Sequence, residues 1–542
     1  MKTSKIETNI IHINSEQKMK RSIELVLDPE IAFDDAKLDQ VVRKHLLLKA
    51  EDEFTIVKLR RSVDARSRSP LINYSLDIYI SEFPQPESPV SSNYKDVSSS
   101  KRKVLIVGAG PAGYFAALEL IERGLKPVIF DRGKDVRSRR KDLRAIQQFS
   151  KLNPDSNYCF GEGGAGTYSD GKLYTRSHKR GDISKALRIL VEHGATSDIL
   201  VDAHPHIGSN KLPVVVQNLR ETIIKCGGEV HFNSLVTDFI IRESKCLGVM
   251  INNSEEHVAD AVILAAGHSA RDIFYLLHSK EIKIENKPFA LGVRAEHPQT
   301  LIDEIQYRQN PRSRHLPAAS YKLATQVLGR GVYSFCMCPG GLIVPAATSP
   351  GEIVVNGMSM SRRDSEFANS GLVVAIEEED LKDFEQHGEL RGLEFQKSVE
   401  KKFFDAGDSS QKAPAQRMTD FTEQRESANI GKTSYIPGVY GYELNQLLPQ
   451  QIGRRLRIAM KDFGKKMKGY FTEEAYLVGI ESRTSSPVRI PRDRQTFEHT
   501  EIIGLYPSGE GAGYAGGIIS AALDGQNTAK AVAAMHTGKS PY

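Results

Sequence analysis

The stretch that decides the fold is KVLIVGAGPAGYFAALELIERGLKPVIFDRG, residues 103–133. After Lys103, four residues form a continuous aliphatic run of the kind found in buried parallel strands. The turn GAGPAG (108–113) follows, and the apolar residues after it have the spacing of a helix that ends at Gly124. A second buried run ends in Asp131. This order of strand, glycine turn, helix and strand predicts a parallel βαβ unit.

The glycines of this turn have separate tasks in a unit that binds a dinucleotide. Gly108 permits the tight turn, Gly110 lets the backbone approach a pyrophosphate, and Gly113 lets helix and strand pack closely. The helix N-terminus would face the phosphates with its positive end. Asp131 stands where an acid contacts a ribose hydroxyl. The residues predicted to bind the cofactor here are Gly108, Gly110, Pro111, Ala112, Gly113, Asp131 and Arg132.

The pattern G-x-G-x-x-G occurs twice more, as GEGGAG at 161–166 and as GAGYAG at 511–516. A bare glycine pattern is weak evidence, so its surroundings decide. GEGGAG has neither a buried strand before it nor a helix after it. GAGYAG stands too close to the C-terminus for the strand that should carry the acid. The sequence therefore predicts one dinucleotide-binding unit, and the other glycines need a different explanation.

Length and composition are those of a globular protein with more than one domain. The chain has 542 residues, enough for two or three domains. Hydrophobic residues make up 40% and charged residues 26%, which is ordinary. The net charge of +5 is small for this length and gives no general case for nucleic-acid binding.

We expect neither a secretory signal, nor a membrane span, nor a zinc site. The five cysteines are scattered and form no C-x-x-C pair, which argues against a disulfide framework and a zinc site, so no metal is predicted. No apolar run is long enough to span a bilayer. The N-terminus, MKTSKIETNIIHINSEQ, lacks the apolar core of a secretory signal. We expect a cytoplasmic protein without a membrane span.

The first 81 residues have their own pattern. RSIELVL alternates like a strand, DDAKLDQVVRKHLLL places its apolar residues on one helical face, and FTIVKLRRS and INYSLDIYI read as two more strands. A small β-α-β-β domain at 1–81 is predicted. Residues 82–100 are rich in Pro and Ser and are predicted to be a linker.

Three later segments complete a resemblance to the FAD-dependent oxidoreductases of the glutathione-reductase-like superfamily. VTDFII (236–241) with GVMINN (248–253) looks like the strand pair before the second family motif. HVADAVILAAGHSARD resembles the strand-to-turn motif itself, with Ala where Thr is usual. EIIGLYPSGEGAGYAGGIISAALDGQ resembles the closing flavin motif, with Glu in place of Asp. By this resemblance the cofactor-binding residues also include Val236, Ala266, Gly267, Gly509, Glu510, Gly516, Gly517 and Ile518.

Within that superfamily the chain looks most similar to the uncharacterised "NAD(FAD)-utilising dehydrogenase" family. The blocks that carry this resemblance are RSVDAR, GEGGAGTYSDGKL, FCMCPGG, NGMSMSRRDSEFANS, PAQR and ESRTSSPVRI. It implies an α/β fold: a Rossmann-like FAD-binding domain assembled from discontinuous segments (101–290 and 490–542), with an inserted α+β substrate domain (291–489). The implied cofactor is FAD. No reaction is implied.

The resemblance also gives the loop GEGGAGTYSDGKL a place. In related flavoproteins a loop of small residues passes close to the isoalloxazine, and glycine N–H groups there approach the ring or the phosphates without obstruction. The alternative is a glycine-rich surface turn. The residues that the flavin interpretation assigns to the cofactor are Gly163, Gly164, Gly166, Thr167, Ser169, Asp170 and Lys172.

Catalytic side chains are harder to predict because a flavin carries the redox chemistry itself. Cys336 and Cys338 would face the same side of a strand, either as a redox dithiol or, as C-x-C spacing favours, as structural or substrate-lining residues. His268 would either approach the cofactor or cap a turn. Arg483 would either bind an anionic substrate or, as we favour, pair with Glu481.

Two basic segments, 132–144 and 454–469, have helical spacing interrupted by acids, which is typical of solvated faces. An anionic partner or RNA is the alternative for the second segment. No second strand-glycine-helix unit follows the first, so NAD(P)H as electron donor would have to bind without a Rossmann domain of its own.

These observations lead to a flavoprotein hypothesis with two alternatives. We expect an FAD-dependent oxidoreductase that performs two-electron chemistry on a small molecule, apolar or anionic, with FALGVRAEHP (289–298) opening the substrate domain. The alternatives are an FAD-dependent RNA-modifying protein and a non-catalytic FAD-bound scaffold. The oligomeric state is not predicted.

Overall fold

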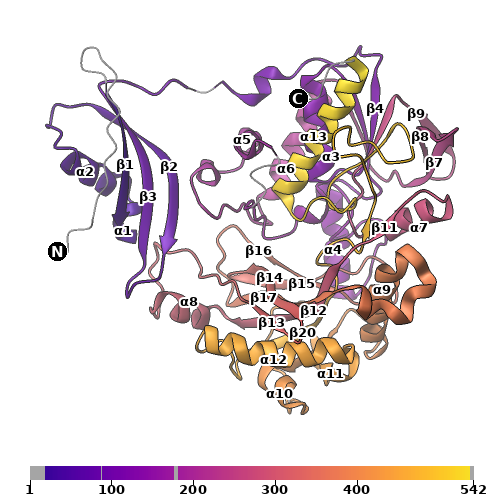
Figure 1. Cartoon of the computed structure of the whole chain (residues 1–542). Helices are drawn as coiled ribbons and strands as arrows, with labels where there is room; N and C mark the ends of the chain where they lie inside the picture. Colours follow the sequence, from indigo (N-terminus) through magenta and orange to yellow (C-terminus); the bar gives the residue numbers. More distant parts are fainter. Residues whose placement is uncertain (1–18, 87, 176–180, 538–542) are drawn as a thin grey trace.

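The central element of this computed structural model, which describes residues 19–86, 88–175 and 181–537, is a parallel five-stranded sheet of order β22-β10-β4-β5-β6 (Figure 1). The βαβ unit predicted at 103–133 supplies β4 (Lys103–Val107), α3 (Pro111–Glu122) and β5 (Lys126–Phe130). The other strands are β6 (Glu229–His231), β10 (Ala261–Leu264) and β22 (Leu505–Pro507). The prediction of a mixed α/β chain is confirmed.

Both faces of this sheet are covered, which explains the apolar runs of its three central strands, β10, β4 and β5. Val104 and Ile106 share a core with α3, whereas Leu105 and Val107 share one with an antiparallel sheet on the opposite face. α13 (Ile518–Thr537) lies beside α3. The strands of the antiparallel sheet are β7 (Val236–Arg242), β8 (Lys245–Ile251) and β9 (Glu255–Val258).

The turn between β4 and α3 depends on glycine. Gly108 has a φ of +107°, and a Cβ there would lie 2.5 Å from the carbonyl oxygen of Ala265 on the neighbouring strand connection. A Cβ at Gly113 would collide with the carbonyl oxygen of Gly108. The helix ends before Gly124, whose φ is +78°. Side chains at Gly108 and Gly113 would separate this turn and α3 from the sheet.

A seven-stranded mixed sheet forms the second large part, in the lower half of Figure 1. Its two sides carry α12 (Gln450–Lys466) and the hairpin of β15 (Gly341–Pro345) and β16 (Val355–Ser359). In order, its strands are β13 (Ala324–Val327), β14 (Arg330–Cys338), β17 (Phe367–Ile376), β12 (Phe289–Pro298), β20 (Tyr476–Glu481), β18 (Ala413–Arg417) and β19 (Val439–Gly441). The strand expected at 289–298 is thus β12.

The first of the two basic segments begins before α4 (Val136–Phe149), and the second lies mainly on α12. α12 buries Leu456, Met460 and Phe463 in the core and exposes basic residues such as Lys461 on its other side. It is therefore an amphipathic helix with a solvated basic face.

The chain passes between the two large parts at two places, and these two passages pair with each other. β11 (Glu285–Asn286) and β21 (Val488–Arg489) form a short antiparallel ladder. The boundaries predicted at 290 and 489 stay predictions, as do those at 81 and 100.

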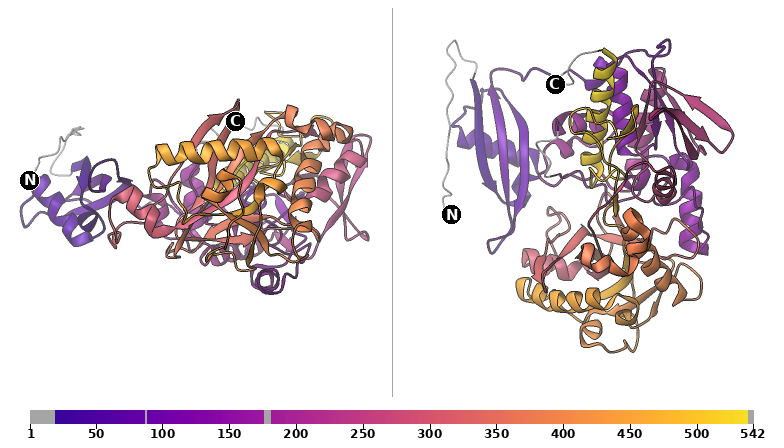
Figure 2. Two further views of the ribbon diagram at one scale, coloured as in Figure 1. Left: turned by 90° about the horizontal axis from the view of Figure 1, so that it is seen from below. Right: turned by 45° about the vertical axis from the view of Figure 1, so that its right-hand side comes forward.

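The N-terminal unit stands to one side of the two larger parts (Figures 1 and 2). Its antiparallel sheet has the order β1-β3-β2. On β2, the N–H of Arg61 donates to Val201 O at 2.9 Å and its guanidinium contacts Asp202 at 2.8 Å, so this strand anchors the unit to the body. The elements are β1 (Met19–Leu27), α1 (Pro29–Ala32), α2 (Asp35–His45), β2 (Phe54–Asp64) and β3 (Leu71–Ile80).

The second half of the predicted linker is packed rather than free. It contains a 3₁₀ turn, η1 (Val90–Asn93), whose first N–H donates to the Glu192 carboxylate at 2.6 Å. Val90 and Val97 are buried in the core of the central sheet. The Pro- and Ser-rich composition of this segment gave no indication that these two valines are buried.

The remaining helices connect and cover the sheets: η2 (Gly164–Gly166), α5 (Ile183–Glu192), η4 (Ser197–Leu200), α6 (Leu212–Lys225), α7 (Arg271–Ser279), α8 (Gln299–Tyr307), η5 (Glu378–Leu390), α9 (Arg391–Asp405), α10 (Met418–Glu423) and α11 (Leu444–Leu447). Across residues 19–86, 88–175 and 181–537, no helix has the length and apolar character that crossing a membrane requires.

Candidate functional site

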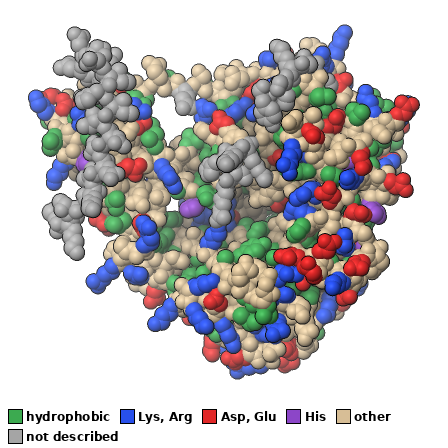
Figure 3. All heavy atoms as spheres, in the orientation of Figure 1, with side chains coloured by type: hydrophobic (Ala, Val, Ile, Leu, Met, Phe, Trp, Pro, Cys, Tyr) green, Lys and Arg blue, Asp and Glu red, His purple; other side chains and the backbone are tan. Residues whose placement is uncertain are grey.

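A cavity of about 410 Å³ lies between the central sheet and the seven-stranded sheet. We call it the central cavity. On the face shown in Figure 3 the surface is hollowed, with Lys and Arg side chains beside the hollow. The predicted cofactor residues that line the central cavity are Gly108, Gly110, Pro111, Ala112, Asp131, Arg132, Gly164, Gly166, Ser169, Asp170, Lys172, Val236, Ala266, Gly267, Glu510, Gly516, Gly517 and Ile518. Gly113, Gly163, Thr167 and Gly509 lie behind its wall.

The first wall is the βαβ turn. A Cβ at Gly110 would have Gly164 Cα as its nearest neighbour, at 4.0 Å, so the backbone here is open to the cavity. The carboxylate of Asp131 accepts from Ala109 N at 2.9 Å and from Gly133 N at 2.8 Å. Asp131 therefore stabilises both the turn before α3 and the turn after β5, and it also lines the cavity. Its contact with a ribose stays a prediction.

Arg132 lies at the end of β5. Its guanidinium contacts Asp155 and Asp272, each at 2.8 Å, and lies 4.5 Å from the ring centroid of Phe160. Asp272 and Phe160 also line the cavity. These contacts hold the Arg132 side chain along the cavity wall.

The second wall is the N-terminus of α13. A Cβ on Gly516 or on Gly517 would meet no atom within 4 Å, and the same holds for Gly267 after β10. Bare backbone at these points leaves room where side chains would otherwise project. The helix N-terminus also presents its positive end to the cavity. The residues present therefore fit a dinucleotide such as FAD.

The loop GEGGAG is held in place by its own second residue, Glu162, whose carboxylate is buried. Val136 N donates to it at 2.8 Å, Tyr114 Oη at 3.1 Å, and Arg220 at 3.3 Å. Burial raises the pKa of Glu162. No sequence pattern identified this residue as the support of the loop.

Two of the loop glycines do not offer their N–H groups to a cofactor, contrary to the expectation. The N–H of Gly163 donates to Ala109 O and that of Gly164 to Gly161 O, both at 2.8 Å. Thr167 is buried, and its hydroxyl donates to Glu162 O at 3.0 Å. The loop needs these bonds to fold back against the βαβ turn, so Gly163 and Thr167 shape the wall from behind.

Lys172 and Asp170 form a charged group at the cavity side of the same loop. Lys172 Nζ lies 3.6 Å from Asp170 Oδ2 and 3.8 Å from the Sγ atoms of both Cys336 and Cys338. Arg363 donates to Asp170 at 2.6 Å. Burial alone would raise the pKa of Asp170, but the two cations lower it below its usual value.

The cysteine pair departs from the regular strand that the sequence predicted. The pairing of β14 with β17 shifts register between Phe335 and Cys338, and Cys336 has a φ of +45°. This bulge directs the half-buried Cys336 into the cavity, whereas Cys338 is buried behind it. The Cys338 thiol donates to Cys336 O at 3.3 Å.

His268 and Glu510 face each other across the cavity floor, with 3.8 Å between Nε2 and Oε1. Burial and the nearby cations Arg483 and Arg271 lower the pKa of His268 to about 3, so the imidazole is neutral. Burial, with a contribution from Cys336, raises the pKa of Glu510 to about 7. Glu510 is thus the group on this floor that titrates near neutral pH.

The pairing favoured for Arg483 is wrong. Arg483 contacts Glu352 at 2.6 Å and Glu400 at 3.1 Å, whereas Glu481 pairs with Arg294 at 2.7 Å. β20 ends at Glu481, so the chain leaves the sheet before Arg483 and turns towards α9.

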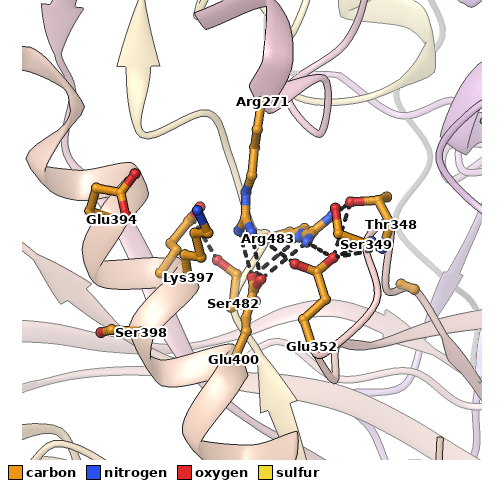
Figure 4. A network of polar contacts seen from close by, with 12 residues as sticks. Arg271, Thr348, Ser349, Glu352, Glu394, Lys397, Ser398, Glu400, Ser482 and Arg483 are labelled. Atoms are coloured by element: carbon orange, nitrogen blue, oxygen red, sulfur yellow. Dashed lines mark hydrogen bonds and ion pairs between the residues drawn. The ribbon is translucent and has the colours of Figure 1, made fainter. Parts of the chain in front are cut away.

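Figure 4 shows Arg483 and Arg271 converging on Glu400 and Glu352 from different elements. Arg271 lies 2.8 Å from Glu400 and 3.1 Å from Glu352. The two arginines lower the pKa of the fully buried Glu400 to about 2, against the effect of burial. Arg271, Glu352 and Glu400 carry no sequence signal because three distant segments supply them.

Within the described residues no group of three or more His, Cys, Asp or Glu side chains could hold a metal ion.

Comparison with known proteins agrees with a flavin at this site. A family profile described as "FAD binding domain" matches residues 101–145, and one described as "FAD-dependent protein, C-terminal domain-like" matches 288–484. A "domain of unknown function" profile matches 19–79. The cofactor of this flavoprotein is FAD. The first profile covers the βαβ turn and the second covers most of the seven-stranded sheet.

An uncharacterized protein of Clostridium beijerinckii is 40% identical over 529 residues, which covers 94% of this chain and 97% of that protein. Among solved structures, a glycine oxidase of Bacillus cereus shares 13% identity, covers 80% of this chain and 95% of its own, and gives a TM-score of 0.34. A geranylgeranyl bacteriochlorophyll reductase-like protein of Thermoplasma acidophilum shares 12%, covers 81% and 80%, and also gives 0.34. Scores this low support no argument about fold or reaction.

Proposed function

We propose that this chain is an FAD-dependent oxidoreductase acting on a small molecule. The chain belongs to the same family as the uncharacterized Clostridium beijerinckii protein. One observation carries the proposal. The central cavity is lined both by the bare backbone of the FAD-binding segments and by side chains of the seven-stranded part, including Phe335 and Val355. A cofactor in the first portion would share the space with a ligand in the second.

When bound, FAD supplies two-electron oxidation and reduction. On the protein side, we assign the pyrophosphate to the N-terminus of α3, next to Gly110, and the flavin end to the N-terminus of α13, next to Gly516 and Gly517. The positive end of a helix stabilises negative charge that develops nearby.

The wall supplied by the seven-stranded part suggests the class of substrate. Phe335, Val354 and Val355 give it an apolar surface and Asn356 adds a polar group, while Lys172 of the glycine loop adds a positive charge beside it. Lining of this kind suits a molecule with an apolar body and a polar or anionic end.

The floor supplies a proton donor and acceptor. A carboxyl with a pKa of about 7 is close to evenly divided between its two forms at neutral pH, so Glu510 can give or take a proton there. The imidazole of His268, 3.8 Å away, is neutral and adds no charge beside this carboxyl.

The direct test is the visible spectrum of the purified full chain before and after anaerobic addition of NADH and then NADPH. A yellow protein that either nucleotide bleaches would support an oxidoreductase that draws electrons from that nucleotide. A yellow protein that neither bleaches, even in the presence of small-molecule donors, would contradict the proposal and favour an RNA-modifying or scaffold role. Salt-dependent binding of tRNA would separate those two.

A further inference from the structure

The central cavity holds a thiol surrounded by donors. The side-chain partners of Cys336 Sγ within the described residues are both donors, the Lys172 ammonium at 3.8 Å and the thiol of Cys338. An ammonium is a donor and accepts nothing, so a neutral S–H at this place would point its proton at a cation. A thiolate would instead meet an opposite charge.

The neighbouring thiol does not compete for this role. Cys338 has an acceptor for its proton, because its Sγ donates to Cys336 O at 3.3 Å. Cys338 is also fully buried, whereas Cys336 is half-buried and lines the cavity. The pKa of Cys336 lies well below its usual value, with Cys338 and Lys172 as favourable partners, while the pKa of Cys338 is raised.

The charges around Cys336 come from five segments, and their balance favours a negative sulfur. Two of the three acidic neighbours are paired with arginines: Arg363 donates to Asp170 at 2.6 Å, and Arg294 donates to Glu481 at 2.7 Å. The third, Glu510, has a pKa of about 7 and is partly protonated at neutral pH. The titratable and charged groups that face Cys336 are Lys172 and Asp170 from the glycine loop, Arg294 from β12, Cys338 from β14, Glu481 from β20 and Glu510 after β22.

We propose that Cys336 is a thiolate nucleophile of the central cavity, that Lys172 is the positioning residue that holds it in this form, and that it takes small carbon electrophiles. The sulfur lone pair forms a C–S bond with the electrophilic carbon. The electron pair displaced from that carbon leaves with the departing group, or moves onto a conjugated carbonyl. No proton has to leave the sulfur first.

Iodoacetamide is the probe, since attack by the sulfur forms a thioether and releases iodide. The alkylation rate of each cysteine is measured by peptide mass spectrometry on the full chain as purified, between pH 6.5 and pH 8.5. A cysteine in an unstructured peptide, with a pKa of about 8.5, becomes roughly fiftyfold faster over this range. Cys336 should change by less than about threefold.

Lys172→Met should restore a steep rise with pH at Cys336, and Lys172→Arg, which keeps the charge, should leave the profile flat. Cys159 is the matched control, because it is also half-buried and lines the same cavity, but its Sγ contacts Ala346 O at 3.8 Å. Its alkylation should be the same in all three proteins.

If Cys336 in the unmodified protein had a profile as steep as that of a cysteine in an unstructured peptide, the proposal would be overturned. If Lys172→Met altered Cys159 as well, indicating misfolding, the unmodified protein and Lys172→Arg would still decide. The measurement reads the thiol itself, so its outcome is separate from that of the spectral test.

Discussion

One side chain on the cavity floor, that of Glu510, makes the stability of the FAD-free protein depend on pH. The pKa of Glu510 is raised from 4.5 to about 7, so the folded chain binds this proton more tightly than the unfolded chain. Between these values the folded state holds more protons, and the free energy of unfolding therefore falls as pH rises.

Glu510→Gln, which cannot titrate, should remove this dependence. From pH 5 to pH 7.5 the unmodified protein should lose about 2 kcal/mol more of its unfolding free energy than the variant does, as measured by urea unfolding of FAD-free samples. Equal losses in the two proteins would show that Glu510 titrates normally.

Predicting single residues from sequence succeeded where a local pattern determined them. Gly108 was placed correctly in a tight turn and Gly113 at a close packing of helix and strand, because the strand before them and the helix after them were recognisable. Arg483 was paired wrongly, because the nearest acid in the sequence is not the nearest in space. The bulge that turns Cys336 into the cavity has no signature in the sequence.

The βαβ element gives a prediction about two glycines of one turn. Gly108 has a φ of +107° and would place a Cβ 2.5 Å from Ala265 O, whereas Gly110 has a φ of −80° and no neighbour closer than 4.0 Å. Gly108→Ala should therefore lower the free energy of unfolding by about 2 kcal/mol or more, and Gly110→Ala should leave it unchanged within about 0.5 kcal/mol.

Urea unfolding of the two FAD-free variants measures both effects. If Gly108→Ala were as stable as Gly110→Ala, the turn between β4 and α3 would not require glycine at position 108.

Helices and strands were the easiest features to predict from the sequence, because each has a characteristic spacing of apolar residues. The run at 103–107 became β4, and the strand expected at 289–298 became β12. The packed half of the linker was missed because two valines in a Pro- and Ser-rich stretch give no period.

Across the whole molecule, the buried network of Arg271, Arg483, Glu352 and Glu400 joins α7 to α9 and to the connections of the seven-stranded part (Figure 4). Glu400→Gln would leave both arginines buried with less opposing charge. We expect the free energy of unfolding to fall by about 3 kcal/mol.

The adjacent residue on α9 provides the control for this change. Lys401 forms an exposed pair with Asp405 at 2.6 Å, and Lys401→Ala should change stability by no more than about 0.5 kcal/mol. Urea unfolding in which Glu400→Gln and Lys401→Ala behave alike would show that the network does not hold the two parts together. Sequence could not predict this network, since its members are brought together only by the complete fold.

The central claim is that the central cavity holds FAD, and titration of FAD into the flavin-stripped protein tests it most directly. A Cβ at Gly516 would enter empty space, so Gly516→Val should fold normally but occupy room that the cofactor needs, whereas Gly331→Val changes β14 away from the cavity lining. Unmodified protein and Gly331→Val should bind a single FAD per chain with equal affinity, and Gly516→Val should bind roughly tenfold or more weakly. Equal binding by all three proteins, or no binding by the unmodified chain, would contradict the account.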